Sequence, residues 1–119
     1  LELFISKRRA IAKNYINFIK NPKLILPNLY ENNLSSWHLF IVRCSKLKDR
    51  KKLYGYLKKN NITSVLHYIP INNHYFYRKK KYEKFVNAKH YYDTALSIPI
   101  FPDLKKKELK KIIKLLNRF

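Results

Sequence analysis

The sequence has no methionine, one cysteine and one glycine among its 119 residues. The single cysteine, Cys44, excludes an internal disulfide and any metal site built from several cysteines. Loops that hold phosphate groups use several glycines, because backbone N–H groups must approach the anion closely. Gly55 alone cannot supply such a loop. The chain also opens without methionine, at Leu1, directly on a helical pattern, so we expect it to be a piece of a larger protein.

Long apolar runs are absent as well. The longest cover about four residues, far short of the roughly 20 that a membrane-spanning helix needs. No apolar stretch follows a basic start, as it would in a secretory signal. We therefore expect a cytoplasmic protein that does not bind a membrane.

Positive charge is abundant. Lys and Arg number 27 against 7 Asp and Glu, which gives a formal net charge of +20. Such an excess is typical of nucleic-acid-binding proteins, where lysine and arginine neutralise phosphates. Only 6 of these residues are Arg, the side chain that makes bidentate contacts with bases and phosphates. The charge therefore predicts a solvated surface that attracts anions, without specific nucleic-acid binding.

The spacing of apolar residues predicts an α+β fold with helices packed on a small sheet. The first helix would present Phe4, Ile11, Tyr15 and Phe18 on one face. Residues 22–34 and 72–82 are predicted to be irregular connectors. Helices are expected over residues 3–20, 47–60, about 83–94 and about 105–117, and strands over 36–43, 63–69 and 96–100.

Residues that could carry chemistry are scattered. The histidines His38, His67, His74 and His90 do not show the spacing of a helical metal site, so no metal is expected. Cys44 has apolar neighbours and is predicted to be a structural thiol. The carboxylates form no evident acid–base pair.

The most unusual segment covers residues 67–78, which leave a predicted strand and combine aromatic rings, imidazoles and amides. Loops of this kind often line binding sites, where the rings stack on a nucleobase or sugar and the polar groups bind hydroxyls. Alternatively, Tyr68, Tyr75 and Phe76 fill the space beneath a long connector. The residues alone leave both interpretations open.

Three blocks in order resemble one family. Residues 4–15 resemble the long helix that joins the large and small domains of the pyridoxal-phosphate-dependent sugar aminotransferases of the DegT/StrS family. Residues 35–40, with Arg43, resemble the first strand of that small domain. The most distinctive block comprises His67-Tyr68-Ile69-Pro70-Ile71, Tyr77, residues 95–102 and a final amphipathic helix.

The resemblance implies a division of the chain and of the chemistry. Residues 1–34 would be the connecting helix and linker from a missing large domain. Residues 35–119 would be the C-terminal small α+β domain of a fold-type I aminotransferase, with an antiparallel or mixed sheet. The cofactor, pyridoxal phosphate, and the lysine that forms its Schiff base would belong to the large domain. No catalytic or cofactor-binding residue is therefore expected here, and the chain alone should be inactive.

The resemblance also implies the substrates. The intact enzyme would be a homodimer that takes an amino-acid donor and a nucleotide-linked sugar. The pattern is closest to enzymes for UDP-linked 4-keto-6-deoxy amino sugars, as in pseudaminic-acid pathways for surface polysaccharides and glycans. The substrate-binding residues in this chain would be His67, Tyr68, Tyr77 and His38. Many members carry a second histidine where this chain has Asn72, which is a departure from the pattern.

Two interpretations from other classes compete with the aminotransferase. One is a small basic nucleic-acid-binding domain, and the other is an inactive remnant or interaction module. The coding region upstream of Leu1 distinguishes these two interpretations from the aminotransferase, because only the aminotransferase requires an in-frame segment with the cofactor lysine.

Overall fold

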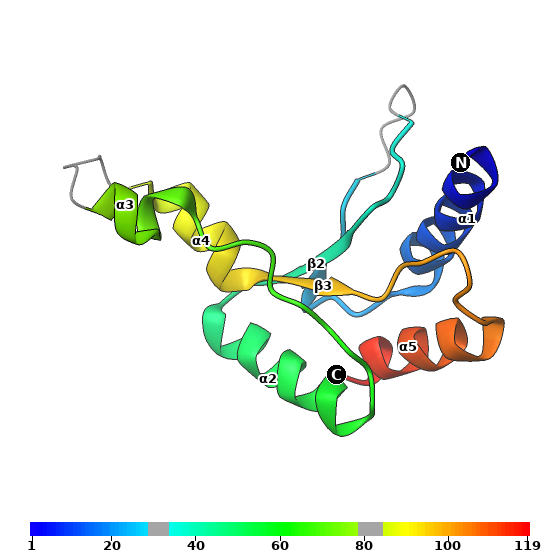
Figure 1. Ribbon diagram of the computed structural model, residues 1–119. Helices are drawn as coiled ribbons and strands as arrows, with labels where there is room; N and C mark the ends of the chain where they lie inside the picture. The colour runs from blue at the N-terminus through cyan, green and yellow to red at the C-terminus, as the bar shows by residue number, and fades with distance from the viewer. Residues whose placement is uncertain (29–33, 79–84) are drawn as a thin grey trace.

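The computed structural model describes residues 1–28, 34–78 and 85–119. It confirms an α+β fold in which helices surround a small sheet (Figure 1). The helices in these ranges are α1 (Glu2–Phe18), α2 (Leu47–Lys59), α3 (Tyr75–Arg78), α4 (Val86–Thr94) and α5 (Lys106–Arg118), with a 3-10 turn η1 (Ile71–Asn73). The strands are β1 (Leu24–Ile25), β2 (Phe40–Cys44) and β3 (Ala95–Ile98).

The three strands form an antiparallel sheet in the order β1-β2-β3. In β2 the side chains alternate between the two faces of the sheet, as the period of two residues requires. Phe40, Val42 and Cys44 are buried on one face, and Ile41 and Arg43 are half-buried on the other. The β3 strand is buried on both faces along its whole length, although it lies at one side of the three-stranded order.

The core lies between the buried face of the sheet and helices α1, α2 and α5. Leu53 and Leu57 lie one turn apart on α2 and are fully buried. Leu116 of α5 and Tyr15 of α1 are also fully buried in the same cluster. The Tyr15 hydroxyl donates a hydrogen bond to the carbonyl oxygen of Pro99 (2.7 Å), which ties α1 to the segment after β3. Since this phenol is buried, its pKa is raised.

The predicted strand over residues 63–69 is wrong. Val65 and Ser97 exchange both backbone hydrogen bonds, but this is an isolated bridge at the edge of β3. The chain then leaves the sheet and forms η1 and α3 within the stretch predicted to be irregular. The short strand β1 was not expected either, because Pro22 and Pro27 on either side of it indicated a connector.

Two other predictions need correction. The strand predicted over 36–43 begins only at Phe40, because Trp37 has a left-handed backbone (φ 49°) that interrupts the extended chain. On α1, Phe4 and Phe18 are 50% and 58% exposed, and the smaller Ala12 takes a core position beside Tyr15. Residues 79–82 of the predicted connector and 83–84 of the predicted third helix lie outside the described ranges.

Within the described ranges, no helix combines the length and apolar character that crossing a membrane requires. The division of the chain at residue 34 stays a prediction. Helix α1 nevertheless contributes Ile11, Ala12 and Tyr15 to the same core as α2 and α5.

We predict that Leu53→Ala lowers the free energy of unfolding by about 2–5 kcal/mol, because it leaves a cavity in the core. The matched control is Leu3→Ala on α1, where the leucine is 66% exposed, and its effect should stay within about 0.5 kcal/mol. Urea denaturation followed by circular dichroism measures both. Equal losses for the two variants would contradict the position of the core.

A second prediction concerns Cys44. Burial and, to a smaller extent, the nearby Asp49 raise the pKa of its thiol to about 11, against an opposing effect of Arg50. In the unfolded chain the thiol has its ordinary pKa of 9.0. The folded form therefore binds the proton more tightly, and the stability that this contributes is present below pH 9.0 and is lost as the pH rises towards 11.

The measurement is the free energy of unfolding as a function of pH for the wild type and Cys44→Ala. The wild type should lose more stability than the variant between pH 9.0 and about 11. Native protein should also react slowly with iodoacetamide near neutral pH, because the thiolate is the nucleophile. Parallel pH profiles for the two proteins, with rapid labelling of the native chain, would contradict the buried thiol.

Candidate functional site

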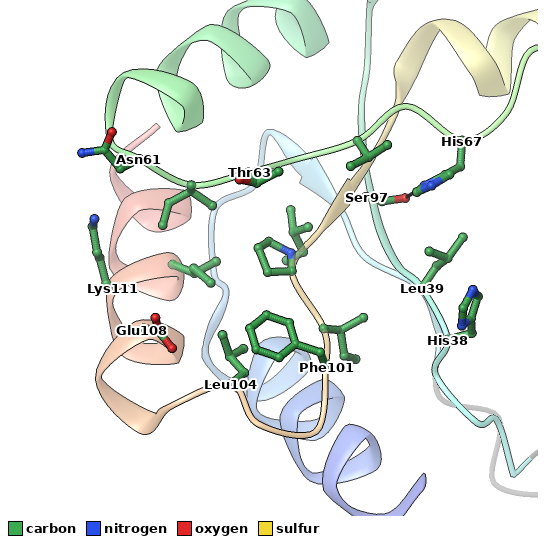
Figure 2. A pocket seen from close by; sticks show the side chains of 16 residues that line it. His38, Leu39, Asn61, Thr63, His67, Ser97, Phe101, Leu104, Glu108 and Lys111 are labelled. Atoms are coloured by element: carbon green, nitrogen blue, oxygen red, sulfur yellow. Dashed lines mark hydrogen bonds between the residues drawn. The ribbon is translucent and has the colours of Figure 1, made fainter. Parts of the chain in front are cut away.

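A cavity of about 450 Å³ lies beside the end of β3. Its walls come from the segments before β2 and after α2, from the chain after β3 and from α5 (Figure 2). His38, His67 and Ser97 lie on one side, as Figure 2 shows, and Glu108 and Lys111 of α5 lie on the other. Apolar side chains between them include Ile98, Pro99, Ile100, Phe101, Leu104 and Ile112.

His67 is positioned by the bridge between Val65 and Ser97. That bridge fixes the chain at the edge of β3, and two residues later the imidazole Nδ1 lies 2.8 Å from the Ser97 hydroxyl oxygen. One tautomer accepts the hydroxyl proton at Nδ1 and donates from Nε2, and the other tautomer reverses both roles. Because Nδ1 is engaged by Ser97, Nε2 is the nitrogen through which this ring can bind a ligand.

His38 reaches the same cavity from a different segment. The preceding residue, Trp37, has a left-handed backbone and stacks its ring on Phe40 at 5.5 Å between ring centroids. His38 is exposed at the cavity, and Leu39 lies next to it in the wall. The structure therefore brings together two imidazoles that are separated by 28 intervening residues in the sequence.

The other two residues expected at the site lie elsewhere. Tyr68 is 70% exposed and packs the edge of its ring against His67, with 4.5 Å between centroids, but it does not line the cavity. Tyr77 lies on α3, where its ring is edge-on to Phe76 at 5.2 Å. Figure 1 shows α3 well to one side of β3, away from α1 and α5. Substrate contacts by Tyr68 and Tyr77 stay predictions.

Three lining residues were not expected from the sequence. Ser97 is a single hydroxyl within the apolar stretch 95–100, and its place in the strand was the available signal. Glu108 and Lys111 belong to a lysine-rich helix that the sequence presents only as a solvated surface. Both side chains already bind other parts of the protein. Lys111 donates a hydrogen bond to the carbonyl oxygen of Asn60 (2.8 Å), and Glu108 accepts one from the Lys105 backbone N–H (3.0 Å).

Other chemistry is limited in the part of the chain that the structure describes. No group of three or more His, Cys, Asp or Glu side chains that could hold a metal ion occurs there. Cys44 is buried in the core cluster and does not line the cavity, which agrees with a structural thiol. The site is therefore suited to hydrogen bonding with a polar ligand whose apolar face lies on the aliphatic and aromatic residues.

Comparisons with known proteins point to one family of aminotransferases. The family model described as the DegT/DnrJ/EryC1/StrS aminotransferase family matches residues 1–117. The dTDP-3-amino-3,6-dideoxy-alpha-D-galactopyranose transaminase of Aneurinibacillus thermoaerophilus is 32% identical over 114 residues, which cover 95% of this chain and 31% of that protein.

Solved structures show the same fold. The chain is similar to DesV of S. venezuelae in complex with a ketimine intermediate, with a TM-score of 0.88 and 24% identity, over 97% of this chain and 31% of DesV. It is also similar to Helicobacter pylori PseC, an aminotransferase of pseudaminic acid biosynthesis, with a TM-score of 0.86 and 23% identity, over 97% of this chain and 32% of PseC. With the family model matching nearly the whole chain, this protein belongs to the DegT/DnrJ/EryC1/StrS aminotransferase family.

Proposed function

We propose that this chain is the C-terminal, substrate-binding portion of a pyridoxal-phosphate-dependent aminotransferase that acts on a nucleotide-linked keto-deoxy sugar. The observation that carries the proposal is the match to the family over residues 1–117, combined with coverage of only 31% of the related transaminase. On this proposal residues 1–34 connect to a large domain and residues 35–119 are the small domain.

The residues that line this cavity do not fit the cofactor. A Schiff base needs a lysine amine that is available inside a cavity, but Lys111, the lysine that lines the cavity, donates to Asn60. The pyridinium nitrogen needs a carboxylate, and Glu108 is engaged at the start of α5. The cofactor phosphate needs converging backbone N–H groups, whereas the one glycine, Gly55, lies within α2. On this proposal pyridoxal phosphate is bound by a region outside this chain, as the family resemblance implies.

The role of this chain is to bind and orient the sugar. His67 Nε2 and the His38 imidazole would exchange hydrogen bonds with sugar hydroxyls or a keto oxygen. Ser97 holds the His67 ring in one orientation through its bond to Nδ1. The apolar wall around Phe101 and Ile98 would cover the less polar face and the methyl group of a 6-deoxy sugar. Tyr68 and Tyr77 are proposed to contact the nucleotide part from outside the cavity.

The finer identity of the substrates is also proposed. We propose a UDP-linked 4-keto-6-deoxy amino sugar. The deoxy amino sugar class is supported by the name of the A. thermoaerophilus relative, whose own nucleotide is dTDP, and by the role in pseudaminic acid biosynthesis named for PseC. The amino group would come from an amino-acid donor, and the product would enter a surface polysaccharide or glycan. The intact enzyme is proposed to be a cytoplasmic homodimer.

The first prediction from this proposal concerns the chain alone. Incubated with pyridoxal phosphate and sodium borohydride, it should show no stoichiometric labelling of a single lysine and no transamination. Sequencing upstream of Leu1 should reveal an in-frame segment with a lysine in a glycine-rich context. Labelling of one lysine at near-unit stoichiometry, or a start codon immediately before Leu1, would contradict the proposal.

The second prediction concerns the sugar site in the protein that includes this upstream segment. His67→Asn and Ser97→Ala should lower kcat/KM for the nucleotide sugar by about 1–2 kcal/mol, or roughly 5- to 30-fold, with little change in Tm. The KM of the amino donor should stay unchanged. Ser36→Ala, at an exposed serine just before Trp37, is the matched control for the loss of a hydroxyl.

These variants separate binding from packing. If His67→Asn and Ser97→Ala lose stability while the folded fraction keeps wild-type kinetics, then the hydrogen bond between them only seals the fold, and the assignment of the sugar site is wrong.

A further inference from the structure

The backbone of Trp37 has an unfavourable conformation just before β2. Its φ of 49° lies in the left-handed region, where a bulky side chain is uncommon because its Cβ comes too close to a carbonyl oxygen. The other non-glycine residue with a positive φ in the described ranges is Asn61, whose residue type tolerates this region. Strained backbone of this kind persists only where its surroundings enforce it, and it concentrates at functional sites.

Helix α1 holds the backbone that precedes Trp37. Arg9 Nε donates a hydrogen bond to the carbonyl oxygen of Ser35 (2.9 Å), and its Nη2 donates one to the carbonyl oxygen of Leu34 (3.2 Å). The Ser35 hydroxyl oxygen in turn accepts a hydrogen bond from the Trp37 backbone N–H (3.1 Å). These bonds attach the segment before the left-handed turn to α1.

A row of three aromatic rings holds the side chain of Trp37. The indole stacks on Phe40 with 5.5 Å between centroids, and Phe40 packs against Tyr15 of α1 at 4.9 Å. Phe40 and Tyr15 are fully buried, whereas the indole is half-buried. The Tyr15 hydroxyl donates to Pro99, a residue of the cavity wall. Because two of the three rings lie in the core, the indole cannot turn away without losing its stack.

The turn at Trp37 bears on the position of His38. Side chains alternate along an extended strand, so a strand that continued unbent from β2 would place His38 on the core face with Phe40. The chain instead bends at His38, directly after the left-handed residue. The imidazole is exposed in the wall of the 450 Å³ cavity (Figure 2).

We propose that Trp37 is a positioning residue for recognition of the sugar. The left-handed turn, which α1 and the aromatic row enforce, keeps the His38 imidazole at the cavity. This inference rests on the proposed function, because it assigns Trp37 to the sugar site that contains His38. It also gives α1 a part in recognition, although α1 contributes no residue to the cavity wall.

Trp37→Ala and Trp37→Gly form a matched pair of variants. Both remove the indole, but only glycine takes up a left-handed backbone without strain. In the protein that includes the upstream segment, Trp37→Ala should lower kcat/KM for the nucleotide sugar by about 5- to 30-fold, as for a lost hydrogen bond. Trp37→Gly should stay within about threefold of the wild type. The KM of the amino donor should not change in either variant. Equal losses of kcat/KM in the two variants would overturn the inference, because the ring alone would then matter.

The His38→Ala variant shows whether Trp37 acts through the imidazole. In the His38→Ala background, Trp37→Ala and Trp37→Gly should have the same kcat/KM, because no imidazole is left to position. A difference between them that persists in this background would contradict the inference. Wild-type kinetics of His38→Ala alone would contradict it as well.

The turn itself can be measured in the 119-residue chain without a ligand. Backbone chemical shifts in an NMR spectrum distinguish a positive from a negative φ. They should indicate a positive φ at residue 37 in the wild type and in Trp37→Gly, and a negative φ in Trp37→Ala. A negative φ in the wild type would overturn the inference and requires no variant to fold.

The result can be separated from the proposed function. If Trp37→Ala and Trp37→Gly have equal kinetics while His67→Asn still impairs use of the nucleotide sugar, then the positioning role is wrong and the proposed function stands. If the longer protein carries no cofactor lysine and shows no transamination, then the proposed function fails and the inference fails with it.

Discussion

The rest of the structure depends on the burial of β3 on both faces. One face of this strand, with Leu96 and Ile98, packs into the core against Phe40 and Val42. The opposite face carries Ser97, whose backbone holds Val65 and whose hydroxyl holds His67. A single strand therefore joins the hydrophobic core to the candidate site. The His67 imidazole keeps its position although residues 63–69 do not form a strand. The Val65–Ser97 bridge and the His67–Ser97 hydrogen bond fix these residues instead.

On the proposed function, binding of the sugar and the catalytic chemistry lie in different parts of the protein. The chain offers imidazoles, a hydroxyl and an apolar wall, which suit recognition of a sugar, while its cavity lysine and glutamate already serve as structural partners. On the proposed function, this chain, which spans 31% of a related transaminase, binds the sugar, and the groups that the cofactor requires lie outside it. The high positive charge adds attraction for a diphosphate, although salt screens that attraction beyond about 8 Å.

Much of the fold could be predicted from local patterns. The apolar faces of α2 and α5 follow helical spacing, and the structure places these helices where the sequence does, within a residue or two. The predicted strand over 63–69 failed because β-branched residues favour extended chain but cannot specify a partner, and the edge of β3 accepts only Val65. The presence of His38 and His67 in the wall of one cavity depends on tertiary packing, and the left-handed backbone of Trp37 next to His38 is indicated by no local pattern. The resemblance at residues 67–71 and at Tyr77 indicated His67, Tyr68 and Tyr77 alike, and of these three the structure places His67 in the cavity wall.

The most direct measurement is the structure of the longer protein with a bound UDP-linked sugar. The account predicts a sugar oxygen within about 3 Å of His67 Nε2, with the His67–Ser97 hydrogen bond intact. A sugar bound away from β3, with His67 Nε2 bonded only to protein groups, would contradict the assignment of this chain as the sugar-binding portion.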